Sequence, residues 1–291
     1  MEYRIEQYKE EFIEDQYRIA MEVSKDWNFY RPTPPQGLKE AYSRADFDPE
    51  TRYYCFKNGE MVGFIVSRIL GEVDGKVRAD LSYPMVLDGH EEVFDVLYKK
   101  AIDTLEKKEV KIINMEACDK WGSTLEFVEK SNFKFVENRY VLYDYFTNSY
   151  NEEVDIKNAK EYNNDEDFDK LLNYLMNVRG FPEERSRNAI NTIVNVYADD
   201  VYAHAFYVEN NEILARGVAT MITNTKVNFY FSDHNDKFDN ELFAKLIQIF
   251  KQRKVEIVQA YLNKNFQKDE DRYLKLGFRK QGEIKLFEKK L

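Results

Sequence analysis

The sequence predicts an α+β protein built from two lobes in tandem, each with a mixed sheet and flanking helices. Three observations lead to this prediction. The chain has 291 residues, which is long for one compact domain and suits two domains of about 100–150 residues each. Hydrophobic residues make up 43% of it, enough to build a core. The order of expected strands and helices in the first half also returns in the second, which is the mark of an internal repeat.

The first half alternates strands and helices according to its hydrophobic periodicity. We expect a strand at 3–8, a helix over 10–27, a Pro-rich turn at 31–35, hairpin arms at 52–56 and 61–70, a strand at 77–87, a helix over 91–107, a strand at 111–115, a helix over 124–130 and a final strand pair from 133 to 146. Asn58-Gly59 marks the hairpin turn, because both residues tolerate the left-handed backbone that such a turn needs.

The second half repeats this order. We expect a strand at 154–156, helices over 167–178 and 183–196, hairpin arms at 205–208 and 213–222 that turn at Asn210-Asn211, a strand at 227–231, a helix over 240–253, a strand at 255–261, a helix over 271–276 and a final strand pair from 278 to 287. The polar segment 147–153 lacks apolar periodicity and is the expected linker. The predicted lobes therefore span residues 1–146 and 154–291.

Composition excludes several classes of function. The formal charge of −10 disfavours a nucleic-acid partner, because phosphate neutralisation supplies most of such binding. No apolar run approaches the roughly 20 residues that span a bilayer, and the charged N-terminal segment does not resemble a signal peptide. Cys55 and Cys118 stand in no metal-ligand spacing. We expect a cytoplasmic protein without a membrane partner or a metal site.

The order of elements is similar to that of the GNAT N-acetyltransferase fold. The segment Arg272-Tyr-Leu-Lys-Leu-Gly-Phe278 resembles the Tyr-x-x-x-Gly-Phe segment near the end of GNAT domains, and 127–133 is its counterpart in the first half. The two copies resemble the tandem arrangement of mycothiol synthase-like proteins. This resemblance implies mostly antiparallel twisted sheets and the transfer of an acetyl or other acyl group from acetyl-CoA to an amine. The amine would belong to a small molecule, a peptide N-terminus or a lysine.

The resemblance also implies site residues, and it favours the second lobe as the active one. Tyr273 matches the tyrosine that protonates the departing CoA thiolate, whereas the first lobe offers Phe127, which has no hydroxyl group. Glu212 and Glu256 are the expected bases if water relays the proton. The expected contacts to acetyl-CoA in the second lobe are Phe231, Ser232, Lys237, Phe238, Asp239, Asn240, Asn263 and Asn265.

Both lobes depart from the family at the turn that holds the pyrophosphate. The family pattern is Gln/Arg-x-x-Gly-x-Gly/Ala, and the corresponding segments are 87–92 (Leu-Asp-Gly-His-Glu-Glu) and 235–240 (Asn-Asp-Lys-Phe-Asp-Asn). Carboxylates repel a pyrophosphate, and a Cβ atom obstructs the close backbone approach that glycine permits. Lys237 is the cation of the second turn that would meet a phosphate.

Other interpretations remain open at this stage. Tyr273 can simply pack against the core, Asn263 and Asn265 can be turn residues, and Glu256 can be a solvated strand residue. A binding module that kept the GNAT cleft but lost acetyl-CoA explains both degenerate turns. A transferase that depends on aminoacyl-tRNA would need a basic channel, which the net charge disfavours. The sequence does not define the acceptor or the oligomeric state.

Overall fold

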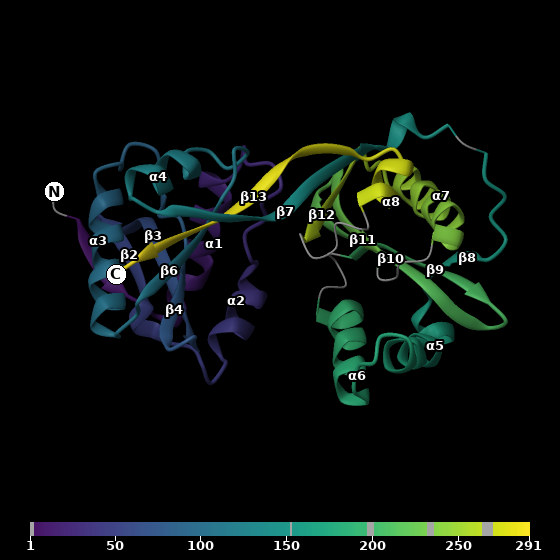
Figure 1. Ribbon diagram of the computed structural model, residues 1–291, viewed down its shortest axis with the longest axis horizontal. Coiled ribbons are helices and arrows are strands. Elements are labelled where there is room, and N and C mark those ends of the chain that lie inside the picture. The colour runs from purple at the N-terminus through teal and green to yellow at the C-terminus, as the bar shows by residue number, and fades with distance from the viewer. Residues whose placement is uncertain (1–2, 152, 197–200, 232–235, 264–269) are drawn as a thin grey trace. The chain divides into compact units, whose positions relative to one another are not determined.

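The structure is a computed structural model that describes residues 3–151, 153–196, 201–231, 236–263 and 270–291 (Figure 1). It divides into two compact units. Unit 1 comprises residues 1–139 and 282–291, and unit 2 comprises residues 140–281. This division differs from the lobes expected from the sequence, because the last strand of each unit comes from the other half of the chain.

Unit 1 is a sheet with helices on both faces. Its strands run in the order β1-β2-β3-β4-β6-β13, and β5 pairs with β3. The elements are β1 (Arg4–Gln7), η1 (Glu10–Phe12), α1 (Ile13–Val23), α2 (Pro35–Tyr42), η2 (Pro49–Thr51), β2 (Arg52–Lys57), β3 (Glu60–Val73), β4 (Lys76–Leu81), β5 (Met85–Val86), α3 (Val93–Lys107), β6 (Ile112–Ala117) and α4 (Thr124–Lys130), with β7 (Lys134–Phe146) starting here and β13 (Arg279–Lys290) ending here.

The alternation of side chains along β2 explains how this sheet carries two cores. Tyr53 and Cys55 pack with Leu97 of α3 on one face. Tyr54 packs with Phe12 and the helix α1 on the other face. Successive residues of a strand point to opposite faces, so the uninterrupted apolar run of β2 is buried from both sides.

The parallel strands β4 and β6 begin as neighbours and then separate. Their pairing runs from Arg78 with Ile112 to Asp80 with Asn114, although both strands continue beyond that point. The backbone beyond Asp80 therefore lacks a neighbouring strand on this side, and space opens between the two strand ends.

Unit 2 repeats the plan, with the strand order β7-β12-β11-β10-β9-β8. The further elements are η3 (Thr147–Ser149), β8 (Ala159–Glu161), α5 (Asn164–Asn177), α6 (Glu183–Asn191), the π-helical turn η4 (Thr192–Val196), β9 (Val201–Glu209), β10 (Glu212–Thr223), β11 (Lys226–Phe231), α7 (Asp236–Gln252), β12 (Ile257–Asn263) and α8 (Glu270–Lys275). The core on one face contains α7 and α8 residues, and the core on the other contains α5 and α6 residues. The parallel strands β11 and β12 pair up to Phe229 and Ala260.

The predicted element order is confirmed, with several corrections. The strand expected at 77–87 is two strands, β4 and β5, and β5 pairs with β3. Each expected final strand pair is one long strand, β7 or β13, whose backbone stays extended without an intervening turn. No strand lies at 154–156, and β8 starts at Ala159 instead. The Pro-rich turn leads into helix α2, which Pro35 begins, a position where proline costs no hydrogen bond. Helix α6 ends at Asn191, before the π-helical turn.

No helix of the described residues is long and apolar enough to cross a membrane.

Candidate functional site

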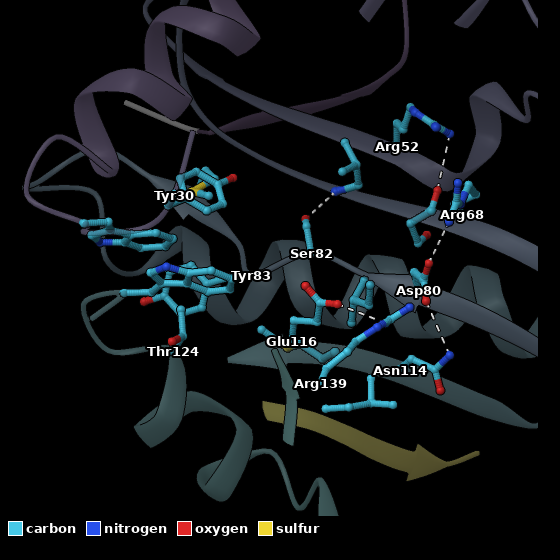
Figure 2. Close-up of a pocket in the computed structure, with 18 residues that line it drawn as sticks. Tyr30, Arg52, Arg68, Asp80, Ser82, Tyr83, Asn114, Glu116, Thr124 and Arg139 are labelled. Carbon is cyan, nitrogen blue, oxygen red and sulfur yellow. Dashed lines mark hydrogen bonds and ion pairs between the residues drawn. The ribbon is translucent and has the colours of Figure 1, made fainter. Parts of the chain in front are cut away.

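A cavity of about 400 Å³ lies in unit 1, where β4 and β6 separate (Figure 2). Its walls come from β2, β3, β4, β6, the segment after α1, the start of α4, and single residues of β7 and β13. Volumes of roughly 300–1,000 Å³ are typical of small-molecule sites. The site residues expected from the sequence lie in unit 2, so sequence reasoning missed this cavity.

One end of the cavity is aromatic. The ring centroid of Trp27 lies 5.0 Å from that of Tyr30, 5.7 Å from Tyr83 and 6.3 Å from Trp121. Gly122 permits this packing, because its φ is +48° and a Cβ atom there would lie 2.8 Å from Nε1 of Trp27. This end therefore offers ring faces and edges to an apolar or cationic group.

The other end of the cavity is charged. Figure 2 shows that its side chains lie away from Tyr30 and Tyr83. Arg139 forms an ion pair with Glu116 at 2.9 Å, and Arg68 forms one with Asp80 at 3.0 Å. The Asn114 amide donates a hydrogen bond to Asp80. Two carboxylates and two guanidinium groups thus alternate along the wall formed by β3, β4, β6 and β7.

Arg52 adds a third cation to this end. Its Nη1 donates to Thr51 Oγ1 at 2.9 Å and to the carbonyl oxygens of Asp48 and Ser67. Its guanidinium lies over the rings of Tyr42 and Phe47. These partners are all neutral, and among the described residues no carboxylate lies within ion-pair distance of Arg52. The residue is 8% exposed, so its charge is largely withdrawn from water.

Two titratable groups lie at the junction of the aromatic and charged ends. Burial raises the pKa of Glu116, Asp80 raises it further, and the charge of Arg139 opposes both. Burial also raises the pKa of the Tyr83 hydroxyl, and the charge of Glu126 adds to the effect. Glu116 thus becomes a stronger base than an exposed glutamate, while Tyr83 keeps its proton at neutral pH.

A second cavity of unit 1, of about 570 Å³, lies beside α3 and α4 and shares only Tyr83 with the first. Phe94 and Tyr98 of α3, Phe127 of α4 and Lys130 line it. The Tyr83 ring contacts the rings of Phe94 and Phe127. Tyr83 therefore separates a cavity on one side of the β4–β6 gap from a cavity on the other.

The turn before α3 is already occupied by a carboxylate. Glu91 Oε1 accepts a hydrogen bond of 2.8 Å from the backbone N–H of Gly89, and the bond lowers the pKa of Glu91. Gly89 has a φ of +82°. An N–H group before a helix is the kind of donor that binds phosphate, so Glu91 competes with any anion at this turn.

In unit 2, the structure brings two of the predicted residues together. Tyr273 of α8 is 4% exposed, and its hydroxyl accepts a hydrogen bond of 3.4 Å from the backbone N–H of Phe231. Phe231 ends β11, just beyond the last pair that β11 makes with β12. Tyr273 thus lies beside the end of β11, beyond the last pair that β11 makes with β12.

Asp239 is paired within the protein. Both oxygens of its carboxylate accept hydrogen bonds from Arg272, and each of the two residues is 5% exposed or less. The guanidinium of Arg272 lies 4.1 Å from the ring centroid of Phe231. Phe238 packs on Tyr207 with ring centroids 4.3 Å apart. Asp239 and Phe238 are therefore core residues on the first turns of α7.

The predicted bases lie far from Tyr273. Glu256 is exposed and directly precedes β12, at the end where β12 pairs with the start of β11. Along β11, six residues or roughly 20 Å separate the position beside Glu256 from Phe231. Glu212 is exposed at the β9–β10 turn, five residues or about 17 Å beyond Gly217, the partner of Phe231. Neither is within hydrogen-bond reach of Tyr273.

The remaining predicted contacts divide in two groups. Asn240 is exposed on α7, and Asn263 is half-buried at the end of β12. Ser232 and Asn265 lie outside the described residues, and so does the side chain of Lys237.

For Glu116 the sequence did contain a signal, because a charged residue in the apolar strand 112–117 is unusual. No comparable signal marked Arg52 or Trp27.

Comparison with known proteins supports the fold. No family model matches the sequence, and no curated protein matches it. Among solved structures, the chain is similar to a tandem GNAT protein from the clavulanic acid biosynthesis pathway, with a TM-score of 0.68, 11% identity, and 99% and 98% of the two chains covered.

Two further solved structures agree with this. A GNAT-family acetyltransferase from Colwellia psychrerythraea has a TM-score of 0.63 at 12% identity, with 98% of this chain and 99% of that chain covered. A GCN5-related N-acetyltransferase from Sphaerobacter thermophilus has a TM-score of 0.58 at 10% identity, with 99% and 95% covered. These identities speak for the fold alone, and on that basis the chain has the GNAT acetyltransferase fold in its tandem, two-lobe form.

Proposed function

We propose that this protein is an acyltransferase that moves an acyl group from a CoA thioester, acetyl-CoA in the simplest case, to an amine bound in the unit 1 cavity. One observation carries the proposal: Glu116, a carboxyl group with a raised pKa, lines a cavity at the gap between two parallel strands. The proposal places the reaction in unit 1, whereas the sequence favoured Tyr273 in unit 2. The same set of variants, described below, tests the assignment to unit 1 and the assignment to unit 2.

Glu116 is the proposed general base. An amine must lose a proton before or as it attacks the thioester carbon, and a carboxylate with a raised pKa accepts that proton better. Arg139 lies 2.9 Å from Glu116 and holds its carboxylate in place. The positive charge of Arg139 also favours the ionised form of Glu116. A bound ammonium group first loses one proton to solvent. As the new C–N bond forms and the C–S bond breaks, a second proton passes from the nitrogen to Glu116. The thiolate takes a proton from the general acid, which regains one from Glu116 through solvent.

Tyr83 is the proposed general acid. The leaving thiolate needs a proton, and Phe127 at the family's position on α4 cannot supply one. Tyr83 borders both cavities of unit 1, and its raised pKa keeps the phenol protonated. In this proposal the thioester lies in the cavity beside α3 and α4, and the thiolate departs on that side of Tyr83.

A second candidate function has a specific observation in its favour. Carboxylates of the chain itself lie where each unit would bind a pyrophosphate. At the turn before α3, Glu91 accepts a hydrogen bond from the Gly89 N–H group. On the first turns of α7, Asp239 pairs with Arg272. A binding module that has lost acetyl-CoA would show this. Its ligand would bind in the unit 1 cavity without any acyl transfer.

Titration separates the two candidates. Trp27 and Trp121 are the two tryptophans of the sequence, and both line the unit 1 cavity. Acetyl-CoA and CoA should be titrated by calorimetry and by tryptophan fluorescence. Binding of acetyl-CoA supports the transferase, whereas no heat and no thermal stabilisation at millimolar concentration favour the binding module.

Matched variants then assign the active unit. If unit 1 is active, Tyr83→Phe and Glu116→Gln should each lower kcat/KM by about 10²–10⁴-fold, and Tyr273→Phe and Glu256→Gln should leave it unchanged. The opposite pattern would move the reaction to unit 2. If neither pair of variants loses activity, both the unit 1 and the unit 2 assignments are refuted.

A further inference from the structure

The charges that line the unit 1 cavity do not balance. Three guanidinium groups, those of Arg52, Arg68 and Arg139, face the carboxylates of Asp80 and Glu116. Arg68 and Arg139 each have a carboxylate partner. The partners of Arg52 are neutral oxygens and ring faces, so one positive charge remains in excess at a mostly buried position.

A buried excess charge is costly, and a bound anion reduces that cost. The two carboxylates that line this cavity, Asp80 and Glu116, each already pair with another arginine. A ligand that brings its own carboxylate would supply the missing charge. Arg52 and Arg68 line this end of the cavity together, and guanidinium groups bind carboxylates in a planar, two-bonded geometry.

The other two features of the cavity define the rest of such a ligand. Glu116 belongs to the charged end, on its side towards Tyr83, and is the carboxylate that an ammonium group would meet (Figure 2). Tyr30 and Tyr83, with the two tryptophans, offer apolar surface to a side chain. A volume of about 400 Å³ suits a molecule of amino-acid or dipeptide size rather than a protein segment.

We infer that the acceptor is a small zwitterion, an amino acid or short peptide with a free amine, a carboxylate and an aromatic or large apolar side chain. The inference rests on the proposed function for its amine acceptor, and it adds the carboxylate and the side chain. Arg52 recognises the carboxylate with Arg68, Glu116 meets the amine, and the aromatic end takes the side chain.

Four small molecules with one phenyl ring test this without any acyl donor. L-Phenylalanine carries both charges, phenethylamine lacks the carboxylate, L-phenylalaninamide replaces it by a neutral amide, and 3-phenylpropionate lacks the amine. Each is titrated into the full-length protein and followed by tryptophan fluorescence and calorimetry. We expect L-phenylalanine to bind at least tenfold more tightly than any of the other three, because a hydrogen bond to a charged group contributes about that much.

Variants locate the carboxylate. Arg52→Met should weaken L-phenylalanine at least tenfold and leave phenethylamine unchanged. Arg68→Gln, at a mostly exposed side chain that tolerates change, should weaken L-phenylalanine and gives the same information if Arg52→Met unfolds. Arg187→Gln is the matched control, because this residue makes an exposed ion pair on α6 of unit 2.

The outcomes separate this inference from the proposed function. Equal affinity for L-phenylalanine and phenethylamine, or binding of none of the four, overturns the inference whatever acetyl-CoA does. Tight binding of L-phenylalanine with no binding of acetyl-CoA upholds the ligand class and refutes acyl transfer.

Discussion

Replacing Arg272 by methionine should destabilise unit 2 by about 3–5 kcal/mol, the usual cost of removing one partner from a buried ion pair. The side chain of Asp239 is 5% exposed, and the side chain of its partner Arg272 is 4% exposed. Removing the arginine takes a bidentate donor away from this buried carboxylate, which keeps its desolvation cost and loses that ion pair. For a unit of this size, the loss corresponds to roughly 10–15 °C in the midpoint of thermal unfolding.

The double variant Asp239→Leu/Arg272→Met should recover most of this loss. A buried ion pair and a well-packed apolar pair of similar volume often have similar stability. The coupling between the two sites is therefore the measured quantity, and a double-mutant cycle isolates it. Leu and Met also suit the surroundings, because Arg272 already lies on the ring of Phe231.

Urea unfolding followed by far-UV circular dichroism is the assay, since both tryptophans lie in unit 1. Arg187→Met is the control, because its pair with Glu183 is about half exposed and should contribute no more than about 0.5 kcal/mol. A loss below about 1 kcal/mol for Arg272→Met, or strictly additive effects in the double variant, would refute the argument.

Three further results are expected. Burial and the charge of Arg216 hold the pKa of His204 well below 6.5, so the unfolded chain takes up a proton that the folded chain refuses. Stability should then be full above pH 6.5 and fall below it by up to about 1.4 kcal/mol per pH unit, less steeply in His204→Gln. Gly122→Ala should destabilise unit 1 by about 1–3 kcal/mol and shift tryptophan fluorescence, because the new Cβ meets Trp27. The rate of acyl transfer should fall as the pH drops through the pKa of Glu116, which lies above its usual range, and Glu116→Gln should lose this dependence.

Each of these results has a control. Gly59→Ala has the same sign of φ but no atom within 4 Å of the new Cβ, so it should leave the fluorescence unchanged. Equal pH slopes in the wild type and His204→Gln would contradict the burial argument for His204. A pH limb that persists in Glu116→Gln would assign the base to another residue.

The repeat was predictable because it depends on local patterns. Hairpin turns need left-handed residues, and Asn58 and Gly59 both have positive φ, as the sequence indicated. The helix expected over 91–107 likewise corresponds to α3, Val93–Lys107. Such signals lie within a few residues of one another, so a single sequence is enough to find them.

The exchange of final strands was not predictable in the same way. β7 and β13 each look like the end of the lobe that precedes them in the chain. In the structure, residues 140–146 pair with β12 and residues 285–290 pair with β6. Pairing between strands far apart in the sequence depends on register and burial across the whole sheet, and local patterns carry no information about it.

By itself, the sequence determined the α+β class, the tandem repeat, the GNAT-like order of elements and the unusual acidic turns. Only the tertiary structure decided where a cavity lies and which charges face it. Arg52, Asp80, Glu116 and Arg139 come from four strands and converge because β4 and β6 separate beyond Asp80. The electrostatics of the cavity arises from that convergence. Burial and the neighbouring charges raise the pKa of Glu116 above its usual range, and in the part of the chain that the structure describes no carboxylate pairs with Arg52.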